Sequence, residues 1–315
     1  MPYFKPLPKR KLSTKVKGLL ISPIQYEVRV ANAQWDSLLA PYEPQRYSRW
    51  DSSDCWALAS VNDYETNLKW LFTNNMFSEE AKSFFLTNNY CNSTGDFTLS
   101  ERFHEILCGN RDNGGTSEEA WQSFYTRGHI PRSQLMYTIE RAESYVSQTD
   151  FDNDYFNKNA VTPQMIALGL QFRKYVTSAY QRIGKEFANQ DISILRAALK
   201  QAPLNLGVPV PVPQMLWNSP VIKYDGGIEM DHEVTCYSIN DDGSYNIRDQ
   251  YQPENKILSA DYYLPSVIQG IVYAIQPQTI STVPQPVAPL DDNFWTKIMN
   301  FFNNIFSKDP VGDVV

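Results

Sequence analysis

Apolar residues recur at helical spacing in four parts of the chain. The first, "CWALASVNDYETNLKWLF", has apolar residues at Trp56, Ala59 and Leu68, which is typical of a buried helix. The others are "SEEAWQSFYTRG", "QMIALGLQFRKYVTSAYQRI" and "DISILRAALKQA". In the second segment we expect Ser117 to be the N-cap and Gly128 to end the helix.

The pattern changes after Pro203. The segments "LNLGVPVPVP", "HEVTCYSI", "GSYNIRDQY" and "VIQGIVYAIQ" are typical of strands, and "NDDG" of a turn between two of them. Because helices come first and strands later, the sequence predicts an α+β fold in which a helical lobe packs against an antiparallel β lobe. The segment "SQTDFDNDYFNKNAVTP" is predicted to be an acidic surface insertion without visible chemistry.

Composition along the chain predicts five parts. Residues 1–30 form a Pro-containing basic arm, 31–277 the globular domain, 278–292 a Pro-rich linker, 293–308 an amphipathic docking helix and 309–315 a tail. The arm is either a solvated terminus or a docking segment for an acidic partner.

The segment "NFWTKIMNFFNNIFSK" has its apolar residues on one side of a helix and its polar residues on the other. It is too short to span a bilayer. It could fold back on the domain, enter a groove of a partner protein or lie on a membrane surface, and the flexible spacer before it favours the last two. Deleting 278–315 is expected to abolish such binding and to leave the chemistry of the domain intact.

Charge and cysteine usage exclude several classes. A net charge of −7 gives no overall case for nucleic-acid binding, so only the basic arm 1–17 could make such a contact. Neither a signal peptide nor an apolar run of membrane-spanning length is visible. The four cysteines form no CxxC pair, which argues against structural zinc and a disulfide framework. We expect no cofactor, and a reducing location that is cytoplasmic or virion-associated.

The candidate chemistry starts at Cys55, in "SSDCWALAS", at the predicted start of a helix. The helix dipole there favours a thiolate over a thiol. A thiol nucleophile also needs a general base and a group that orients the base. Of the three histidines, His104 and His129 are most simply surface or capping residues. His232 opens a predicted strand, and the next strand carries Asp249, so the three residues make a Cys-His-Asp triad proposal.

Five blocks of sequence, in order, resemble the papain-like cysteine proteases. "DCWALAS" is similar to the block that carries the nucleophile, and "LSERFHEILCGNRDNGG" and "EEAWQSFYTRGHIPRSQLMY" are similar to the segments that follow it. "QAPLNLGV" with "WNSPVIKYDGG" is similar to the strand and loop before the histidine. "DHEVTCYSI" with "YNIRDQY" is similar to the blocks that carry the histidine and the asparagine. The resemblance covers about 35–276 and implies a two-lobe fold with the active site in the cleft between the lobes.

The resemblance implies roles for individual residues. Cys55 would be the acylated nucleophile, His232 the general base and acid, and Asp249 the orienting group where the family usually has asparagine. The substrate-binding residues that it implies are Gly114, Gly115, Asp231 and Tyr251. Tyr251 stands where the family has a tryptophan that shields the histidine, and the two glycines match those that run alongside an extended substrate.

Several positions depart from the family pattern. Arg49 stands where the oxyanion glutamine is expected, and Gln45 could replace that glutamine if "RYSRW" forms a longer loop. A carboxylate at Asp54 would oppose thiolate formation unless it points away from the thiol. Ser52 replaces a structural cysteine, so its partner position, Cys108, is a free thiol. The short stretch before Cys55 implies a member without the long inhibitory pro-domain, of a kind found in bacteria and phages.

The leading hypothesis is a cysteine endopeptidase that works through an acyl-enzyme on peptide or protein substrates. The alternative is a catalytically weak papain-like module, virion- or assembly-associated, that is kept for binding and docked through its C-terminal helix. A transferase that uses the same acyl-enzyme is a third possibility.

Overall fold

The computed structural model describes residues 27–109, 114–183 and 191–275. The chain divides at Gln276, and all the described residues belong to the unit Met1–Gln276. The predicted linker and docking helix, and nearly all of the predicted basic arm, lie outside the described residues.

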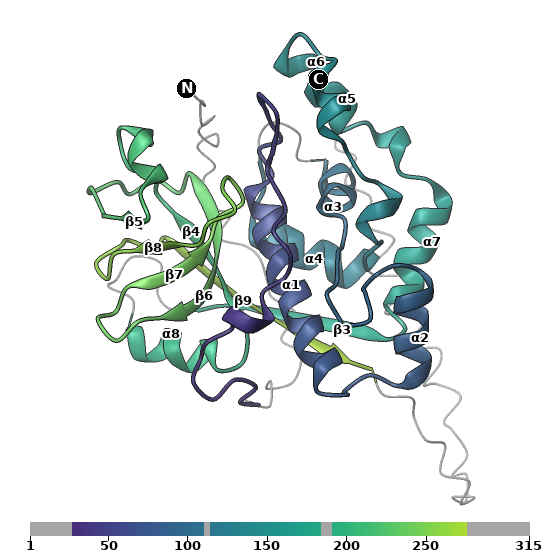
Figure 1. Ribbon diagram of the computed structural model, residues 1–315, viewed down its shortest axis with the longest axis horizontal. Helices are drawn as coiled ribbons and strands as arrows, with labels where there is room; N and C mark the ends of the chain where they lie inside the picture. The colour runs from purple at the N-terminus through teal and green to yellow at the C-terminus, as the bar shows by residue number, and fades with distance from the viewer. Residues whose placement is uncertain (1–26, 110–113, 184–190, 276–315) are drawn as a thin grey trace, which may run out of the picture. The chain divides into compact units, whose positions relative to one another are not determined.

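The central helix is α1 (Cys55–Thr73). It is buried along most of its length and contacts both α4 and the strands β6 and β9 (Figure 1). Polar side chains on its buried faces are held locally: the Asn67 amide donates to the Asp63 carbonyl at 2.8 Å, and the Thr66 hydroxyl donates to the Asn62 carbonyl. Because α1 touches both halves of the fold, its first residue lies close to the sheet.

Within the described residues, the six shorter α-helices that come between α1 and the first strand of the main sheet each begin after a serine or threonine whose side chain accepts a backbone N–H. They are α2 (Glu79–Thr87), α3 (Glu101–Cys108), α4 (Ser117–Arg127), α5 (Ile139–Glu143), α6 (Gln148–Tyr155) and α7 (Pro163–Phe172). Short 3-10 helices lie at η1 (Asp36–Leu38), η2 (Arg132–Gln134), η3 (Lys158–Ala160) and η4 (Gln214–Asn218).

The main sheet has the strand order β3-β9-β4-β6-β7-β8-β5, and every pair is antiparallel except β5 with β8. Its strands are β3 (Val176–Arg182), β4 (Leu204–Val208), β5 (Val221–Ile222), β6 (His232–Ile239), β7 (Tyr245–Arg248), β8 (Lys256–Leu258) and β9 (Ser266–Ala274). Helix α8 (Ile192–Leu199) packs on the sheet at β6. A separate hairpin, β1 (Arg46–Tyr47) with β2 (Trp50–Asp51), precedes α1.

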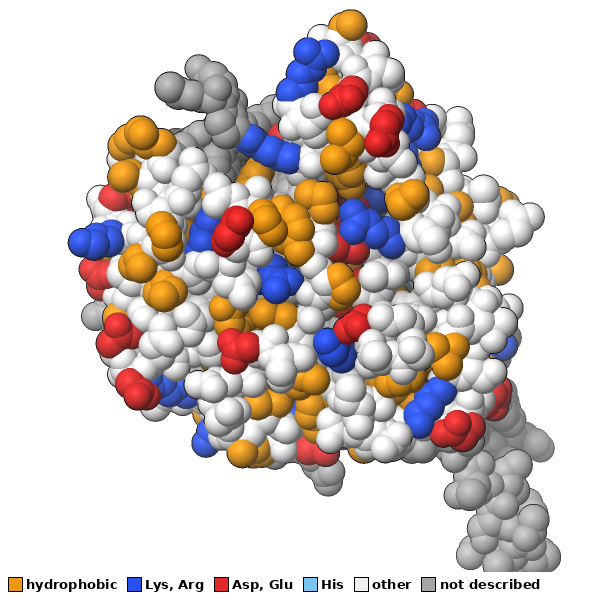
Figure 2. All heavy atoms as spheres, viewed as in Figure 1, with side chains coloured by type: hydrophobic (Ala, Val, Ile, Leu, Met, Phe, Trp, Pro, Cys, Tyr) orange, Lys and Arg blue, Asp and Glu red, His pale blue; other side chains and the backbone are white. Residues whose placement is uncertain are grey.

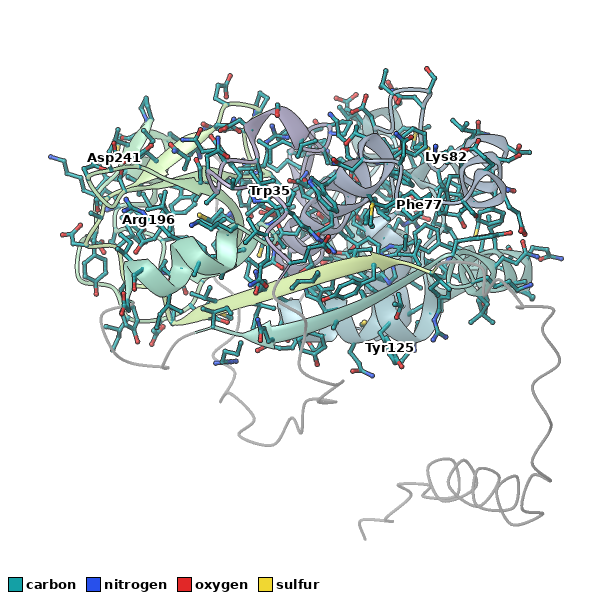
Figure 3. All side chains as sticks on the ribbon, turned by 90° about the horizontal axis from the view of Figure 1, so that it is seen from below. Trp35, Phe77, Lys82, Tyr125, Arg196 and Asp241 are labelled. Carbon is teal, nitrogen blue, oxygen red and sulfur yellow. The ribbon has the colours of Figure 1, made fainter. Side chains whose placement is uncertain are left out.

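The strands β3 and β9 extend from the sheet among the helices, in contact with α1 and α4, towards the end marked by Phe77 and Lys82 (Figure 3). Gly270 on β9 makes this packing possible, because a Cβ there would lie 1.8 Å from the Trp121 ring of α4. The Trp121 indole N–H donates to Asn205 Oδ1 on β4 at 3.0 Å. Helices and sheet therefore share one core, and the predicted α+β class is confirmed.

Some sequence predictions were wrong. The helix expected over "QMIALGLQFRKYVTSAYQRI" ends at Phe172, and the β-branched and aromatic residues after it form β3, which pairs with β9. The N-cap of α4 is Thr116, and Ser117 is the first helical residue; Gly128 ends the helix as predicted.

The histidine prediction was also wrong. Both His104 and His129 are fully buried, and their rings hydrogen-bond each other at 3.0 Å, from His104 Nε2 to His129 Nδ1. Burial lowers the pKa of both groups well below the usual value for histidine. The pair is therefore a neutral core element that packs against the Phe124 ring.

Candidate active site

Cys55 is the first residue of α1, and its side chain is 2% exposed. The backbone N–H of Glu233, the second residue of β6, hydrogen-bonds the Cys55 sulfur and lowers the pKa of the thiol. Burial has the larger effect in the opposite direction, and the nearby Glu233 carboxylate adds to it, so the pKa of Cys55 is raised well above its ordinary value. The resting group is therefore a buried, neutral thiol.

His232 opens β6 and is also buried. Its Nε2 lies 2.9 Å from Asp249 Oδ1, just beyond the end of β7. Because the carboxylate can only accept, Nε2 carries the proton of the neutral imidazole, and Nδ1 is the nitrogen with a lone pair. The hairpin of β6 and β7 thus brings together the histidine and aspartate that the sequence paired.

Asp249 has partners on both oxygens. Oδ1 also accepts the Tyr251 backbone N–H at 3.2 Å, and Oδ2 accepts from Lys256 Nζ at 2.6 Å and from the Trp217 indole N–H at 2.8 Å. Burial opposes ionisation of this carboxyl. The hydrogen bond from His232, the charge that His232 carries when it is protonated and the charge of Lys256 nevertheless hold the pKa of Asp249 well below the usual range. Asp249 is therefore an anion.

Two aromatic rings enclose the imidazole of His232. The Trp217 ring meets it edge to face, with centroids 5.3 Å apart, and the Tyr251 ring lies at 5.1 Å. Both rings come from segments that flank the sheet, η4 and the turn after β7. They limit the access of water to the hydrogen bond between His232 and Asp249, where the resemblance had implied a single tryptophan.

The predicted oxyanion candidate, Gln45, is brought towards α1 by the hairpin β1–β2. The segment "RYSRW" forms this hairpin, and the Ser52 N–H bonds the Gln45 carbonyl at 3.4 Å. The Gln45 side-chain amide donates to Asp51 Oδ1 at 3.0 Å and to the Tyr251 hydroxyl at 2.8 Å. Both amide hydrogens are used in this conformation, so an oxyanion would have to displace one acceptor. Arg49 instead bonds the Tyr145 carbonyl at the exposed turn.

Asp54, the residue before Cys55, is buried but does not act as an isolated anion. Its Oδ2 accepts the Tyr155 hydroxyl at 2.9 Å, and its Oδ1 lies 2.6 Å from Ser52 Oγ. The same Oγ lies 2.7 Å from the Gln45 carbonyl. A hydroxyl has one proton, so if Ser52 donates to the carbonyl, Asp54 must carry a proton and donate to Ser52. Burial also raises the pKa of Asp54 well above its usual value, which agrees with a neutral carboxyl.

Tyr155 lies on α6, inside the acidic segment that the sequence analysis took for a surface insertion. That prediction was wrong, because Phe151 and Tyr155 are fully buried and pack against Tyr47 of the hairpin. The insertion supports the loop that leads into Cys55.

Glu233 is a second buried carboxyl beside the thiol. It accepts the Ser117 backbone N–H at 3.2 Å and the Ser117 hydroxyl, at the start of α4. Burial is the main cause that raises the pKa of Glu233 to about 8, and the bonds from Ser117 only partly oppose it.

Three more carboxyls are buried beside the guanidinium of Arg132, and one of them, Glu101, accepts from Tyr47 of the hairpin. The guanidinium lies 2.6 Å from Glu43 and 3.9 Å from Glu101, and the charge of Arg132 also lowers the pKa of Glu65. Burial nevertheless raises the pKa of Glu43 to about 8. This cluster fixes the segment that leads to Gln45.

The remaining predicted substrate-binding residues directly precede α4 and β6 in the chain. Gly114 and Gly115 are buried and directly precede the N-cap of α4, and Gly114 has a φ of +63° that favours glycine. Asp231 precedes β6, where its N–H bonds the Val208 carbonyl at 3.1 Å.

Exposed apolar side chains gather around β5 and η4 (Figure 2). They are Val212, Met215, Leu216, Val221 and Ile228. Two of them directly precede Trp217, the residue whose ring packs on His232.

Within residues 27–109, 114–183 and 191–275, no group of three potential ligands is arranged to hold a metal ion. Across the same residues, no helix has the length and apolar character needed to cross a membrane. The four cysteines are free thiols.

The sequence analysis missed Lys256 and Trp217. Trp217 gave no signal, because its position on Asp249 depends on the fold of a long loop. Lys256 could have been found: in "KIL" the first and third residues are buried, so alternation in a strand points the lysine inward beside Leu258.

Comparison with known proteins gives structural matches only. No family model matches the sequence, and no curated protein matches it either. Among solved structures, xylellain, a cysteine protease from Xylella fastidiosa, is 14% identical, with a TM-score of 0.50 over 75% of this chain and 83% of that one.

Two further structures are similar at a TM-score of 0.45. The Amb a 11 cysteine protease proform, a ragweed pollen allergen, is 15% identical over 78% of this chain, which spans only 64% of that protein. Bromelain from Ananas comosus, in complex with the E64 inhibitor, is 14% identical over 78% of this chain and 98% of its own. At sequence identities this low, structural similarity is evidence for the fold alone. The match to xylellain shows that this chain has the two-lobe fold of the papain-like cysteine proteases.

Proposed function

We propose that this protein is a cysteine peptidase in which Cys55 forms an acyl-enzyme, His232 transfers protons and Asp249 orients His232. The observation that carries the proposal is the buried hydrogen bond between His232 Nε2 and Asp249 Oδ1 at 2.9 Å. It leaves Nδ1 to exchange a proton with a thiol. Cys55 supplies that thiol from the same end of β6, since its sulfur bonds the N–H of the residue after His232.

The reaction follows from these roles. As the substrate excludes water, the Cys55 thiol gives its proton to His232, and the thiolate attacks the scissile carbonyl carbon. A C–S bond forms, the C–N bond breaks, and His232 protonates the departing amine. Water then gives a proton to His232 and attacks the thioester, which releases the carboxylic acid and returns the proton to Cys55.

The oxyanion of each tetrahedral intermediate needs donors. The Cys55 N–H lies in the first turn of α1 and has no acceptor within the helix. We infer that Gln45 supplies the second donor when one of its bonds, to Asp51 or to Tyr251, is exchanged for the oxyanion.

The proposed substrate is an extended peptide. Gly114 and Gly115 have no side chains that would block an extended peptide. Asp231 directly precedes His232, and the ring of Tyr251 packs on the imidazole of His232. The exposed Met215 and other apolar residues beside Trp217 favour a substrate with apolar side chains on that side of the site.

A binding module with weak or no catalysis is the second candidate. Two observations favour it: burial raises the pKa of Cys55, and the amide of Gln45 is engaged by Asp51 and Tyr251. In that case peptides would bind without being cleaved.

Alkylation of the native protein separates the two candidates. A low dose of an E-64-type epoxide or of iodoacetamide is applied at neutral pH, and mass spectrometry locates the adduct. The proposal expects fast labelling at Cys55, retained in Cys108→Ser and lost in His232→Ala, together with cleavage of a peptide library that Cys55→Ala does not cleave. Cys108 is the matched control because it is a partly exposed thiol next to Arg127. Labelling spread over Cys91, Cys108 and Cys236, with no cleavage, would favour the binding module.

The proposal extends to the residues outside the described part of the chain. We infer that 278–292 is a linker and that 293–308 binds a protein partner or a membrane surface, with the enzyme in the cytoplasm or in a virion. A chain that lacks 278–315 should cleave short peptides as the full chain does and should fail to co-sediment with vesicles or with the partner. Loss of cleavage would mean instead that the segment belongs to the catalytic domain.

A further inference from the structure

We propose that Lys256 is a positioning residue of this active site: its ammonium neutralises Asp249, so that His232 meets a carboxylate–ammonium pair and not an isolated negative charge. The inference rests on the function proposed above and adds a residue that lies seven positions beyond Asp249, on β8.

The contact between Lys256 and Asp249 is short and buried. Lys256 Nζ lies 2.6 Å from Asp249 Oδ2, and the two side chains are 2% and 0% exposed. The ammonium also lies 5.3 Å from the centre of the Trp217 ring, whose N–H donates to the same oxygen. Burial disfavours a charged group, and the carboxylate of Asp249 offsets that effect for the ammonium. The site is therefore built for an ammonium paired with a carboxylate.

The strand pairing fixes Lys256 in this place. Lys256 is opposite Ile247 in the ladder of β7 and β8, and Leu258, two residues on, is fully buried on the same side. The lysine cannot turn to solvent without a change of register of β8.

The four donors divide evenly between the two carboxylate oxygens of Asp249. Oδ1 accepts from His232 and from the Tyr251 N–H, and Oδ2 accepts from Lys256 and Trp217. One oxygen thus faces the proposed base, and the other faces the ammonium of Lys256.

This arrangement matters for proton transfer. A lone buried carboxylate 2.9 Å from an imidazole would stabilise the imidazolium strongly and make it a poor acid towards the departing amine. The ammonium offsets that effect. The charge of the Asp249–Lys256 pair is zero, as it is for the neutral asparagine that the resembling family has at this position.

Other ionisable groups face the same region from α1, from the start of β6, from the hairpin and from the segments beside β1 and β7. They are Cys55, Glu233, Asp51, Asp54, Tyr42, Tyr251, Glu254, Arg248 and Arg46. In the comparison below all of them except Cys55 stay the same in every protein, and Cys55 is replaced alike throughout the NMR series. Differences between variants therefore report on the pair itself.

The test compares the wild type with Lys256→Met, Asp249→Asn and the double variant Asp249→Asn/Lys256→Met. The first readout is the pH profile of Cys55 alkylation. The second is an NMR titration of the His232 ring in the same proteins with Cys55→Ser, which needs no catalysis.

We expect opposite shifts in the two single variants. Lys256→Met leaves an unopposed carboxylate and should raise the titration midpoint of His232 by about one unit or more. Asp249→Asn leaves an unopposed ammonium and should lower the midpoint. The double variant should return close to the wild type, and Lys256→Arg, which keeps the charge, should behave like the wild type. A purely structural role would not produce shifts of opposite sign that cancel.

An unchanged midpoint in Lys256→Met, or shifts of both single variants in one direction, would overturn the proposal. If Lys256→Met does not fold, the outcome depends on whether the double variant restores the midpoint that Asp249→Asn lowers; failure to restore it overturns the role of Lys256. Labelling that is not confined to Cys55 in the wild type would overturn the proposed peptidase, while the His232 titration would still decide the role of Lys256.

Discussion

Replacing Glu233 by glutamine should flatten the dependence of stability on pH between pH 5 and pH 8. Glutamine can keep both contacts of the buried carboxyl: its oxygen accepts the Ser117 N–H, and its amide donates to the Ser117 hydroxyl. It has no proton to lose, however. The variant therefore removes only the titration of this group.

The sign and size follow from the raised pKa. In the unfolded chain Glu233 titrates near 4.5, and in the folded protein burial raises the pKa of Glu233 to about 8. The folded state holds the proton more tightly, so the stabilisation is complete below pH 4.5 and is lost as the pH rises to 8. Between pH 5 and pH 8 linkage gives a loss of about 3.5 kcal/mol from this group, a large part of a typical unfolding free energy of about 5–15 kcal/mol.

Urea unfolding at pH 5, 6, 7 and 8 measures this effect. Wild type should lose about 3.5 kcal/mol more than Glu233→Gln over that range. The matched control is Glu79→Gln, because that carboxylate lies in the first turn of α2, as Glu233 lies against the first turn of α4, but is 89% exposed. It should follow the wild type at every pH. If Glu233→Gln loses stability in parallel with the wild type, the carboxyl is not the buried, proton-holding group described above, and the reasoning fails.

Three further outcomes are expected. Gly270→Ala should lower the free energy of unfolding by about 3 kcal/mol or more, measured in urea, because its Cβ would lie 1.8 Å from the Trp121 ring; a change under about 1 kcal/mol would contradict the described packing. Arg132→Met should cost about 3–5 kcal/mol in the same assay, because the buried carboxyls of Glu101 and Glu43 lose the guanidinium that pairs with both, and a stable variant would show that these carboxyls are neutral without it. Gln45→Ala should lower kcat on a peptide substrate by about 10²–10³, and an unchanged kcat would remove Gln45 from the oxyanion site.

The sequence predicted the elements whose pattern is local. The predicted strand "HEVTCYSI" has the same first and last residues as β6. The helix predicted to begin at Cys55 is α1. The contact between His232 and Asp249 could be predicted because a short turn joins the two strands that carry them, so the residues are close in sequence. The sequence could anticipate this pair because a hairpin constrains both partners.

Contacts that depend on distant segments could not be predicted in the same way. Tyr155 reaches Asp54 across 101 residues, and only the complete fold brings α6 beside the loop before α1. The division between α7 and β3 was missed because "YVTSAY" continued an apolar pattern that began as a helix, and the pairing with β9 decides its conformation. His104 and His129 were misjudged because each satisfies the other's ring nitrogen, a partnership that neither local sequence reveals.

The hairpin β1–β2 has a consequence for how this chain is compared with others. It starts and ends at neighbouring points in space, with Arg46 opposite Asp51, so residues can be added between them without moving what lies on either side. The number of residues between Gln45 and Cys55 is therefore a poor guide to which residue of another chain corresponds to Gln45. A sequence motif with a fixed number of residues before the cysteine would select Arg49, which bonds the Tyr145 carbonyl at the exposed turn. Alignments of such chains should be anchored on ladder partners, and counted intervals should be allowed to vary wherever two paired strands enclose them.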